Sequence, residues 1–269
     1  ADFEKNFGLS WLFKVRGPID PPPDVAVVAI NAATAKQMQL PPLPRDWPRS
    51  IHGRLTEALT QRGASVIVFD LDLQRPRVPE HDLDFAAAVA KAERVVFSAR
   101  LSGMRQPVLD GAGRQVGSVW IEQLQPPIPP MVDAAKGMAP FPLPKVQVDV
   151  FDFWAFKPSL ADSPTMPAVA LQVLALGSHE KWLGLLERIG AEGVDKLPRI
   201  DAGGVRATAM NDMMRTFRGM FRDNAGLLQR ASAAVGGGEA LTPRERQLLR
   251  ALAGLYSGND SRYLNFYGP

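Results

Sequence analysis

Two carboxylates, Asp70 and Asp72, follow an apolar run at residues 66–69 and are the side chains best placed for chemistry. We expect this run to be a strand of a parallel sheet, where ligands collect beyond the carboxyl ends of the strands. Such a cleft could hold a small polar or cationic ligand. Neighbouring segments would bring further candidate ligand-binding residues to the same edge: Asn31, Trp47, Arg49, His52, Ser98 and Arg100.

A purely structural role explains the same residues. Asp70 and Asp72 would then cap neighbouring backbone amides and pair with Arg49 or Arg100, which would hold the edge of the sheet together. Ion pairs at strand ends are common, and one sequence does not separate them from binding sites. Both interpretations stay open at this point.

The run VIVFDLDL also resembles the first motif of the haloacid-dehalogenase-like phosphatases, an apolar strand that ends in Asp-x-Asp. That resemblance implies that Asp70 is a nucleophile and Asp72 a general acid, beside a magnesium ion, which favours carboxylate oxygens. Leu73 and Gln74 stand where that family has Gly and Thr, and no later lysine and acidic pair completes the motif. A magnesium-dependent phosphatase is therefore an alternative function.

Other catalytic and metal-binding patterns are missing from the sequence. It has no cysteine, which excludes disulfides, thiolate metal sites and a cysteine nucleophile. The three histidines, His52, His81 and His179, are not spaced to share a metal ion. For the leading interpretation we predict no catalytic residue, no metal site and no cofactor.

The elements that would position these residues begin with two apolar runs joined by a helix. Residues 25–30 (VAVVAI) are continuously apolar, which predicts a central strand buried on both faces. Ile51 and Leu55 begin an apolar repeat at helical spacing, and Gly63 is placed to end that helix. With a strand at residues 66–69, the pattern predicts a right-handed βαβ unit and a parallel sheet.

Further elements follow in the order expected of an α/β fold. We predict a second crossover helix around Phe85 and Val89, a strand at residues 95–98, a hairpin around Asp110 and Gly111, a brief helix in MVDAAKG, a strand in KVQVDVFDFWAF and a buried helix opened by Pro167. The predicted fold class is α/β, with a predominantly parallel sheet flanked by helices, a β-hairpin and a C-terminal helical insert.

The last third of the chain has a helical pattern. A short amphipathic helix around Trp182 ends at Gly190, residues 236–238 (GGG) indicate a flexible break, and Thr242 opens a final helix with a capping box. A longer helix between them carries an apolar stripe: Met210, Met213, Met214, Phe217 and Phe221. With eight arginines nearby, the stripe could bind a partner, but such stripes usually form core while the arginines solvate the outside.

Composition and charge narrow the class of partner. The net charge of +3 is too small to imply a nucleic-acid partner, and 46% apolar residues is an ordinary globular value. No apolar stretch is long enough to span a membrane, so we expect a soluble piece. The chain begins at Ala1 without methionine, which indicates a processed chain or an excised part of a longer protein.

Several segments occur in a recognisable order: DVAVVAIN, WPRSIHGRL, LTQRGASVIVFDLDL, the helix FAAAVAKA with the strand RVVFSAR, and YLNFYGP. In this order they resemble the landmarks of the CHASE2 domain. The resemblance implies an extracytoplasmic (periplasmic) sensory domain of a bacterial inner-membrane receptor. The output would be a histidine kinase, a nucleotide cyclase or a serine/threonine kinase, and the partner a small ligand or a periplasmic protein.

The resemblance also suggests how the chain is divided. Residues 1–20 would be a membrane-proximal stalk, because aromatic and basic residues occur together there as at a membrane interface, although an ordinary amphipathic helix has the same pattern. Residues 21–178 would be the sensory core, 179–258 a helical insert, and 259–269 a strand that returns to the core and leads to the membrane. Ala1 and Pro269 would then lie on one side. A ligand-free module that forms a homodimer is a third possibility.

Overall fold

The structure, a computed structural model, describes residues 2–143, 150–199, 204–237 and 241–264. It divides into two compact units. The first unit comprises Ala1–Pro48, Pro142–Trp154 and Ser261–Pro269, and the second comprises Arg49–Phe141 and Ala155–Asp260. Both hydrophobic clusters of buried residues belong to the second unit, so the core is built there.

A three-stranded parallel sheet lies at the centre of the second unit. Its strands are β1 (Ile67–Phe69), β2 (Val95–Ser98) and β5 (Gly137–Ala139), in the order β1-β2-β5. The register aligns Phe69 with Phe97 and Phe97 with Met138. Helix α4 (Pro79–Ala92) connects β1 to β2, so this segment is a βαβ unit. The parallel sheet flanked by helices confirms the predicted α/β class.

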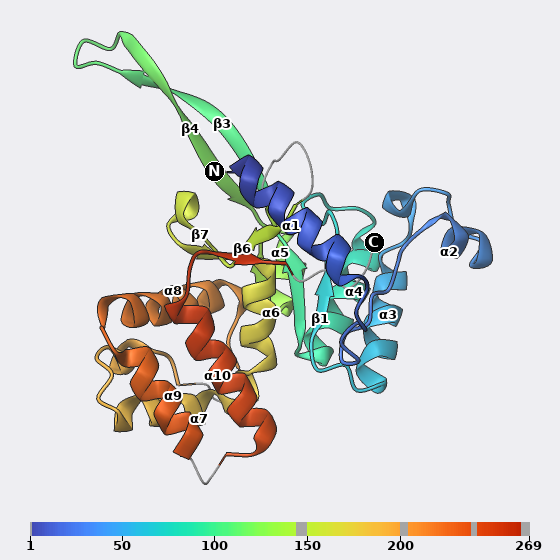
Figure 1. Ribbon diagram of the computed structural model, residues 1–269. Coiled ribbons are helices and arrows are strands. Elements are labelled where there is room, and N and C mark those ends of the chain that lie inside the picture. The colour runs from blue at the N-terminus through green and yellow to red at the C-terminus, as the bar shows by residue number, and fades with distance from the viewer. Residues whose placement is uncertain (1, 144–149, 200–203, 238–240, 265–269) are drawn as a thin grey trace. The chain divides into compact units, whose positions relative to one another are not determined.

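Helices cover both faces of this sheet. Val95 and Phe97 belong to the cluster formed with α3 (Ser50–Gln61), α4 and α5 (Pro129–Ala134). Helices α3 and α4 lie side by side in Figure 1. Val96 belongs to the other cluster, with α6 (Met166–Leu174). A Cβ at Gly137 would lie 2.4 Å from Cγ1 of Val169, so α6 packs directly on the backbone of β5. Alternate side chains of β2 therefore pack into two separate hydrophobic clusters, one on each face of the sheet.

Four more helices pack into the cluster that contains Val96 and α6: α7 (His179–Arg188), α8 (Ala207–Asp223), α9 (Leu227–Gly237) and α10 (Pro243–Ser257). The methionine and phenylalanine stripe of α8 is buried in this cluster, as expected of a core stripe. The capping box is confirmed, because the Glu245 amide donates to Thr242 Oγ1 at 3.2 Å and the Thr242 amide to Glu245 Oε2 at 2.8 Å. The flexible break is wrong at Gly236 and Gly237, which are the last two residues of α9, and Gly238 lies outside the described residues.

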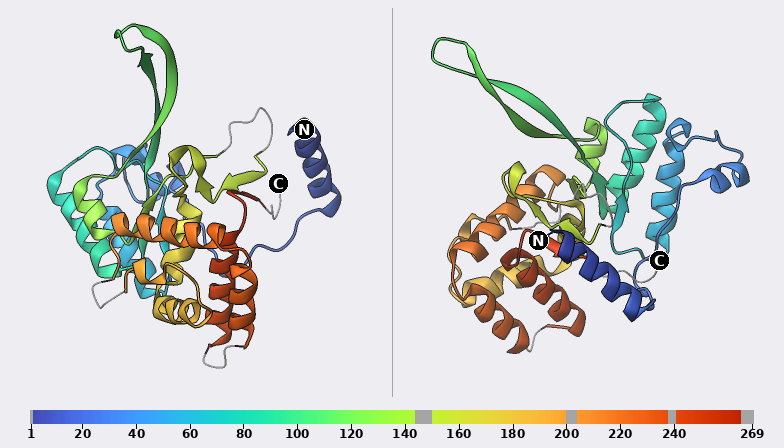
Figure 2. Two further views of the ribbon diagram at one scale, coloured as in Figure 1. Left: turned by 90° about the vertical axis from the view of Figure 1, so that its left-hand side faces the viewer. Right: turned by 45° about the horizontal axis from the view of Figure 1, so that its top comes forward.

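The predicted hairpin is confirmed as β3 (Arg100–Leu109) and β4 (Gln115–Gln125), which pair antiparallel and project as a long ribbon (Figure 2). Because β3 begins two residues after β2, the base of the ribbon lies at the carboxyl end of the parallel sheet. Short elements fill the loops of the second unit: β7 (Phe156–Lys157), η2 (Pro158–Leu160), β8 (Ser163–Pro164), η3 (Leu176–Ser178) and η4 (Val194–Lys196).

The first unit contains α1 (Asp2–Arg16), α2 (Ala32–Gln37), η1 (Pro44–Asp46), β6 (Asp152–Trp154) and β9 (Ser261–Tyr263). β9 confirms a strand at Tyr263, but it pairs antiparallel with β6 and not with the parallel sheet. Of the strand predicted in KVQVDVFDFWAF, the structure shows β6 and the first residue of β7, while residues 144–149 lie outside the described ones. In the described part of the chain, no helix is both long and apolar enough to cross a bilayer.

The strand predicted at residues 25–30 is wrong. The segment has no regular structure, and Val25, Val27 and Val28 are 66%, 90% and 52% exposed. A strand needs a partner for its backbone groups, and among the described residues none pairs with this segment. Helix α3 and strand β1 form as predicted, yet the βαβ unit of the fold is β1-α4-β2, one step later in the chain.

Candidate functional site

Asn31 and Trp47, two of the predicted site residues, have local roles in the first unit. Asn31 caps α2, because its Oδ1 accepts from the Thr34 amide at 3.0 Å. Trp47 Nε1 donates to the carbonyl of Pro41 at 2.7 Å. These contacts describe a helix cap and a loop anchor.

Arg49 and His52 lie at the start of α3 in the second unit and are buried. Arg49 donates to Asp82 Oδ1 at 2.9 Å and to the Arg75 carbonyl at 2.9 Å. The His52 ring contacts Phe69 and Phe85. Burial, with Arg77 and Arg49 close by, lowers the pKa of His52 to about 4, so its imidazole is neutral near pH 7. Arg49 therefore joins α3 to α4 through a buried ion pair.

The remaining predicted residues lie at the carboxyl edge of β1 and β2. Asp70 and Asp72 are exposed, and Asp72 Oδ1 accepts from the Gln74 amide at 3.4 Å. Ser98 ends β2, and Arg100 is exposed at the start of β3. Within the described residues, neither aspartate forms an ion pair with Arg49 or Arg100; the carboxylate that pairs with Arg49 is that of Asp82.

A hollow of about 510 Å³ lies elsewhere in the second unit, between β5, the base of the hairpin and α8. Its apolar wall consists of Leu124, Met138, Leu160 and Ala161. Its polar wall consists of Ser159, Ser163, Thr208, Asn211, Asp212 and Arg215. Because β5 is an edge strand, the hollow lies beside the sheet. It does not lie at the carboxyl ends of β1 and β2, where the ligand site was predicted.

Asn211 is one of two buried polar residues that line this hollow, with an exposed fraction of 7%, and Ser163 is the other at 3%. Asn211 Nδ2 donates to the Met138 carbonyl at 3.1 Å, which satisfies the outer edge of β5. Its Oδ1 is buried and has no hydrogen-bond donor among the described residues. A buried acceptor without a donor costs about 1–3 kcal/mol, so this atom is suited to meet a donor from outside the chain.

Helix α8 presents the rest of the polar wall at helical spacing. Thr208, Asp212 and Arg215 follow one another at intervals of three or four residues, which places them on one face with Asn211. Asp212 and Arg215 form an ion pair. The hollow thus has an acceptor, a carboxylate and a guanidinium close together on one helix.

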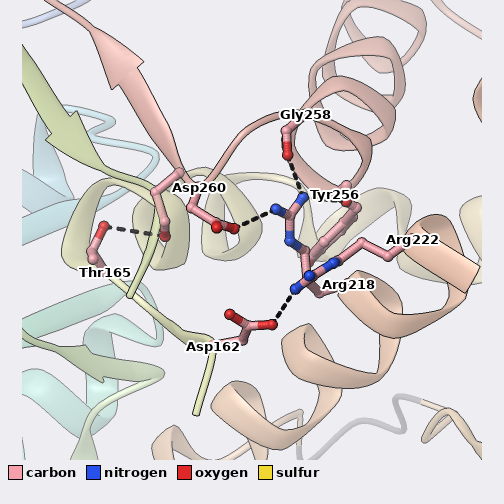
Figure 3. A network of polar contacts seen from close by, with 8 residues as sticks. Asp162, Thr165, Arg218, Arg222, Tyr256, Gly258 and Asp260 are labelled. Atoms are coloured by element: carbon pink, nitrogen blue, oxygen red, sulfur yellow. Dashed lines mark hydrogen bonds and ion pairs between the residues drawn. The ribbon is translucent and has the colours of Figure 1, made fainter. Parts of the chain in front are cut away.

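The same helix carries a buried arginine one turn further on. Arg218 is 3% exposed and donates to the carbonyls of Tyr256 and Gly258 and to Asp260 Oδ1, each at 2.6 Å (Figure 3). We call this set of contacts the exit clamp, because Asp260 directly precedes β9, the last described strand. The guanidinium also lies over the Phe156 ring, 4.8 Å from its centroid.

A second ion pair links α8 to the loop that borders the hollow. Arg222 pairs with Asp162 (Figure 3), which lies between the lining residues Ala161 and Ser163. Ala161 and Asp162 both have positive φ angles, 51° and 52°, an uncommon conformation for residues with side chains. The hollow and the exit clamp therefore share helix α8, and the Arg222–Asp162 pair joins the same helix to the loop beside the hollow.

The sequence carried a partial signal for this site. Thr208, Asp212 and Arg215 form a polar stripe beside the methionine stripe, a pattern that can be found by periodicity alone. The burial of Arg218 carried no such signal, since its partners lie about forty positions away in the chain. The expectation that the arginines near the stripe solvate the outside is wrong for Arg218, which is 3% exposed.

A metal centre has no obvious donor set here. Throughout the parts of the chain that the structure describes, no three His, Cys, Asp or Glu side chains lie close enough together to hold a metal ion. Asp70 and Asp72 therefore have no third ligand of these types in the described residues.

Comparison with known proteins identifies one family. The sequence model of the CHASE2 domain matches residues 4–230. No curated protein and no solved structure matches the chain. The match covers most of both hydrophobic clusters and all of α8.

Proposed function

The chain belongs to the CHASE2 family of sensory domains, and from this membership we propose that it is the signal-input domain of a bacterial transmembrane receptor. It would lie outside the cytoplasm, on the periplasmic side of the inner membrane, as members of this family do. Its task would be to change the state of a cytoplasmic kinase or cyclase when a ligand or a partner protein binds. The observation that carries this proposal is the family match over residues 4–230.

The first helix and the last strand support the proposal, because one short segment holds both. The Phe13 ring of α1 stacks on Phe151 with centroids 5.9 Å apart. β6, which follows Phe151, pairs with β9, and the Leu264 amide donates to the Phe151 carbonyl at 2.7 Å. Helix α1 and the last described strand therefore both contact the segment around Phe151 in the first unit. Ala1 and Pro269, which we predict to lie on one side, are outside the described residues.

The surface of α1 is consistent with a place near a membrane. Trp11, Leu12 and Val15 are 59%, 57% and 65% exposed, and Lys14 and Arg16 lie in the last turn. Exposed aromatic and aliphatic side chains beside basic ones are typical of the membrane–water interface. On this basis α1 would be the stalk that adjoins a preceding membrane span.

The exit clamp offers a route from a binding event to the membrane. A ligand shifts an equilibrium only as far as it binds one arrangement better than another, and couplings of about 1–3 kcal/mol are typical. A ligand at the polar wall of α8 would bias the position of this helix. Arg218 would pass that change to the segment that precedes β9.

The location can be tested by labelling, because the chain has no cysteine to interfere. Ala112→Cys places a single thiol at the exposed turn of the hairpin. In the full-length receptor, we expect a membrane-impermeant maleimide to label the Ala112→Cys variant, beyond any labelling of the unsubstituted receptor, in spheroplasts with an intact inner membrane. Labelling only after that membrane is opened would contradict the proposal.

No observation favours the two alternatives over this one. A magnesium phosphatase would use Asp70 and Asp72, which are exposed and have no third carboxylate or histidine near enough for a metal among the described residues. Turnover of a generic phosphate ester with magnesium, abolished by Asp70→Asn, would revive it. A ligand-free homodimer would be supported by a dimer in solution whose stability no small ligand changes.

A further inference from the structure

We propose that the hollow lined by Asn211, Asp212 and Arg215 binds a small zwitterion that carries an ammonium and a carboxylate on an apolar body, the chemistry of an apolar α-amino acid. This inference rests on the sensory function proposed above and names the class of ligand for it. The residues predicted at the carboxyl ends of β1 and β2 take no part in it.

The buried amide sets the first requirement. Asn211 uses its Nδ2 on the Met138 carbonyl, which fixes the amide orientation and leaves Oδ1 as a buried acceptor without a donor, on a residue that lines the hollow. A ligand must therefore bring a donor, and a purely apolar ligand would leave Oδ1 unpaired. An ammonium group supplies three donors, which suits Asn211 Oδ1 together with the Asp212 carboxylate.

The charges of α8 set the second requirement. Asp212 and Arg215 are exposed and form an ion pair, so the wall has no net charge but presents a negative and a positive group side by side. A simple cation would meet Arg215, and a simple anion would meet Asp212. A zwitterion pairs its carboxylate with Arg215 and its ammonium with Asp212, which gives charge-assisted hydrogen bonds to both groups.

The apolar wall sets the third requirement. Leu124, Met138 and Leu160 face the same space as the polar wall. A volume of about 510 Å³ falls in the range of ordinary small-molecule sites and holds a ligand of amino-acid or dipeptide size. An aliphatic or thioether side chain would remove apolar surface from water on both partners.

Binding to the whole 269-residue chain tests this directly. We expect isothermal titration calorimetry to detect leucine or methionine. Leucinamide lacks the carboxylate and N-acetyl-leucine lacks the ammonium, and each should bind at least about tenfold more weakly, the equivalent of one lost ionic contact. Equal binding of either derivative would overturn the zwitterion requirement, and no binding by leucine, methionine or a leucine dipeptide would overturn the proposal.

Two variants locate the site. Arg215→Gln removes the exposed guanidinium without touching the core, and it should weaken leucine binding at least about tenfold. Asn211→Leu should do the same, with folding checked by circular dichroism, and the surface variant Arg230→Gln on α9 is the matched control. Undiminished binding by both Arg215→Gln and Asn211→Leu would place the ligand elsewhere and overturn the assignment.

The two proposals fail in different ways. If the chain does not bind a zwitterion, calorimetry detects no binding, and the labelling of Ala112→Cys from outside the cell is unchanged. A cytoplasmic location for Ala112→Cys would remove the receptor function even if leucine bound to the hollow.

Discussion

Two buried arginines, Arg49 and Arg218, look alike by burial and partner but belong to different kinds of region. Arg49 is 2% exposed and pairs with Asp82 at 2.9 Å, whereas Arg218 is 3% exposed and pairs with Asp260 at 2.6 Å. The Asp82 side chain is 5% exposed, and the Asp260 side chain is 31% exposed. The first pair is sealed inside the fold, and the second opens toward solvent at one end.

The backbone carbonyls that accept hydrogen bonds from Arg49 and Arg218 also differ in where they lie. Arg49 adds the Arg75 carbonyl, in the loop that leads into α4. Arg218 adds the carbonyls of Tyr256 and Gly258, where α10 ends and has unsatisfied carbonyls to offer. Arg49 thus holds two helices of the sheet layer together, while Arg218 holds the segment through which the chain leaves the core. Burial alone does not tell a structural arginine from one placed on a route between two regions.

The largest effect is expected from Arg49→Met. The substitution leaves the Asp82 carboxylate buried without its cation, which costs about 3–5 kcal/mol of unfolding free energy. Urea denaturation followed by circular dichroism measures this loss. The double variant Arg49→Met with Asp82→Leu should recover most of it, because no charge is then buried. A double variant as unstable as the single one would show that the region depends on the pair itself.

The Arg49 region should also make stability depend on pH through His52. Its folded pKa of about 4 lies below the usual value of 6.5, so between these values the unfolded chain binds more protons. Stability should be unaffected above about pH 6.5 and fall as the pH drops toward 4, by on the order of 3 kcal/mol. Denaturation midpoints across this range measure it. His52→Phe should flatten this part of the profile, and an equally steep profile would assign the dependence to another group.

A smaller but more localised effect is expected from Arg218→Lys. Lysine keeps the charge but lacks the planar fork that reaches two carbonyls and Asp260, so we expect a loss of about 1–3 kcal/mol. Hydrogen exchange should rise at residues 258–264 more than in β1 and β2. Arg222→Lys, at an exposed pair on the same helix, is the control and should cost less than about 1 kcal/mol. A uniform rise in exchange would mean that Arg218 has only a structural role.

The helices and the hairpin were largely predictable because their signals are local. The capping box at Thr242 and Glu245, the turn at Asp110 and Gly111 and the stripe of α8 each arise from residues a few positions apart. Helix α9 was not predicted. Its apolar repeat, Leu227, Ala231 and Val235, is short, and the glycines that follow it directly indicate a break and not a helix.

The sequence by itself determined the α/β class, the crossover helix α4 and the family, since these depend on order and periodicity. Tertiary structure alone decided that residues 25–30 have no partner strand among the described residues, that Arg49 pairs with Asp82, and that Arg218 is buried at the exit clamp. A strand exists only with a partner strand, and a buried charge is tolerated only beside its counter-charge. Both conditions join residues tens of positions apart, which no local pattern specifies.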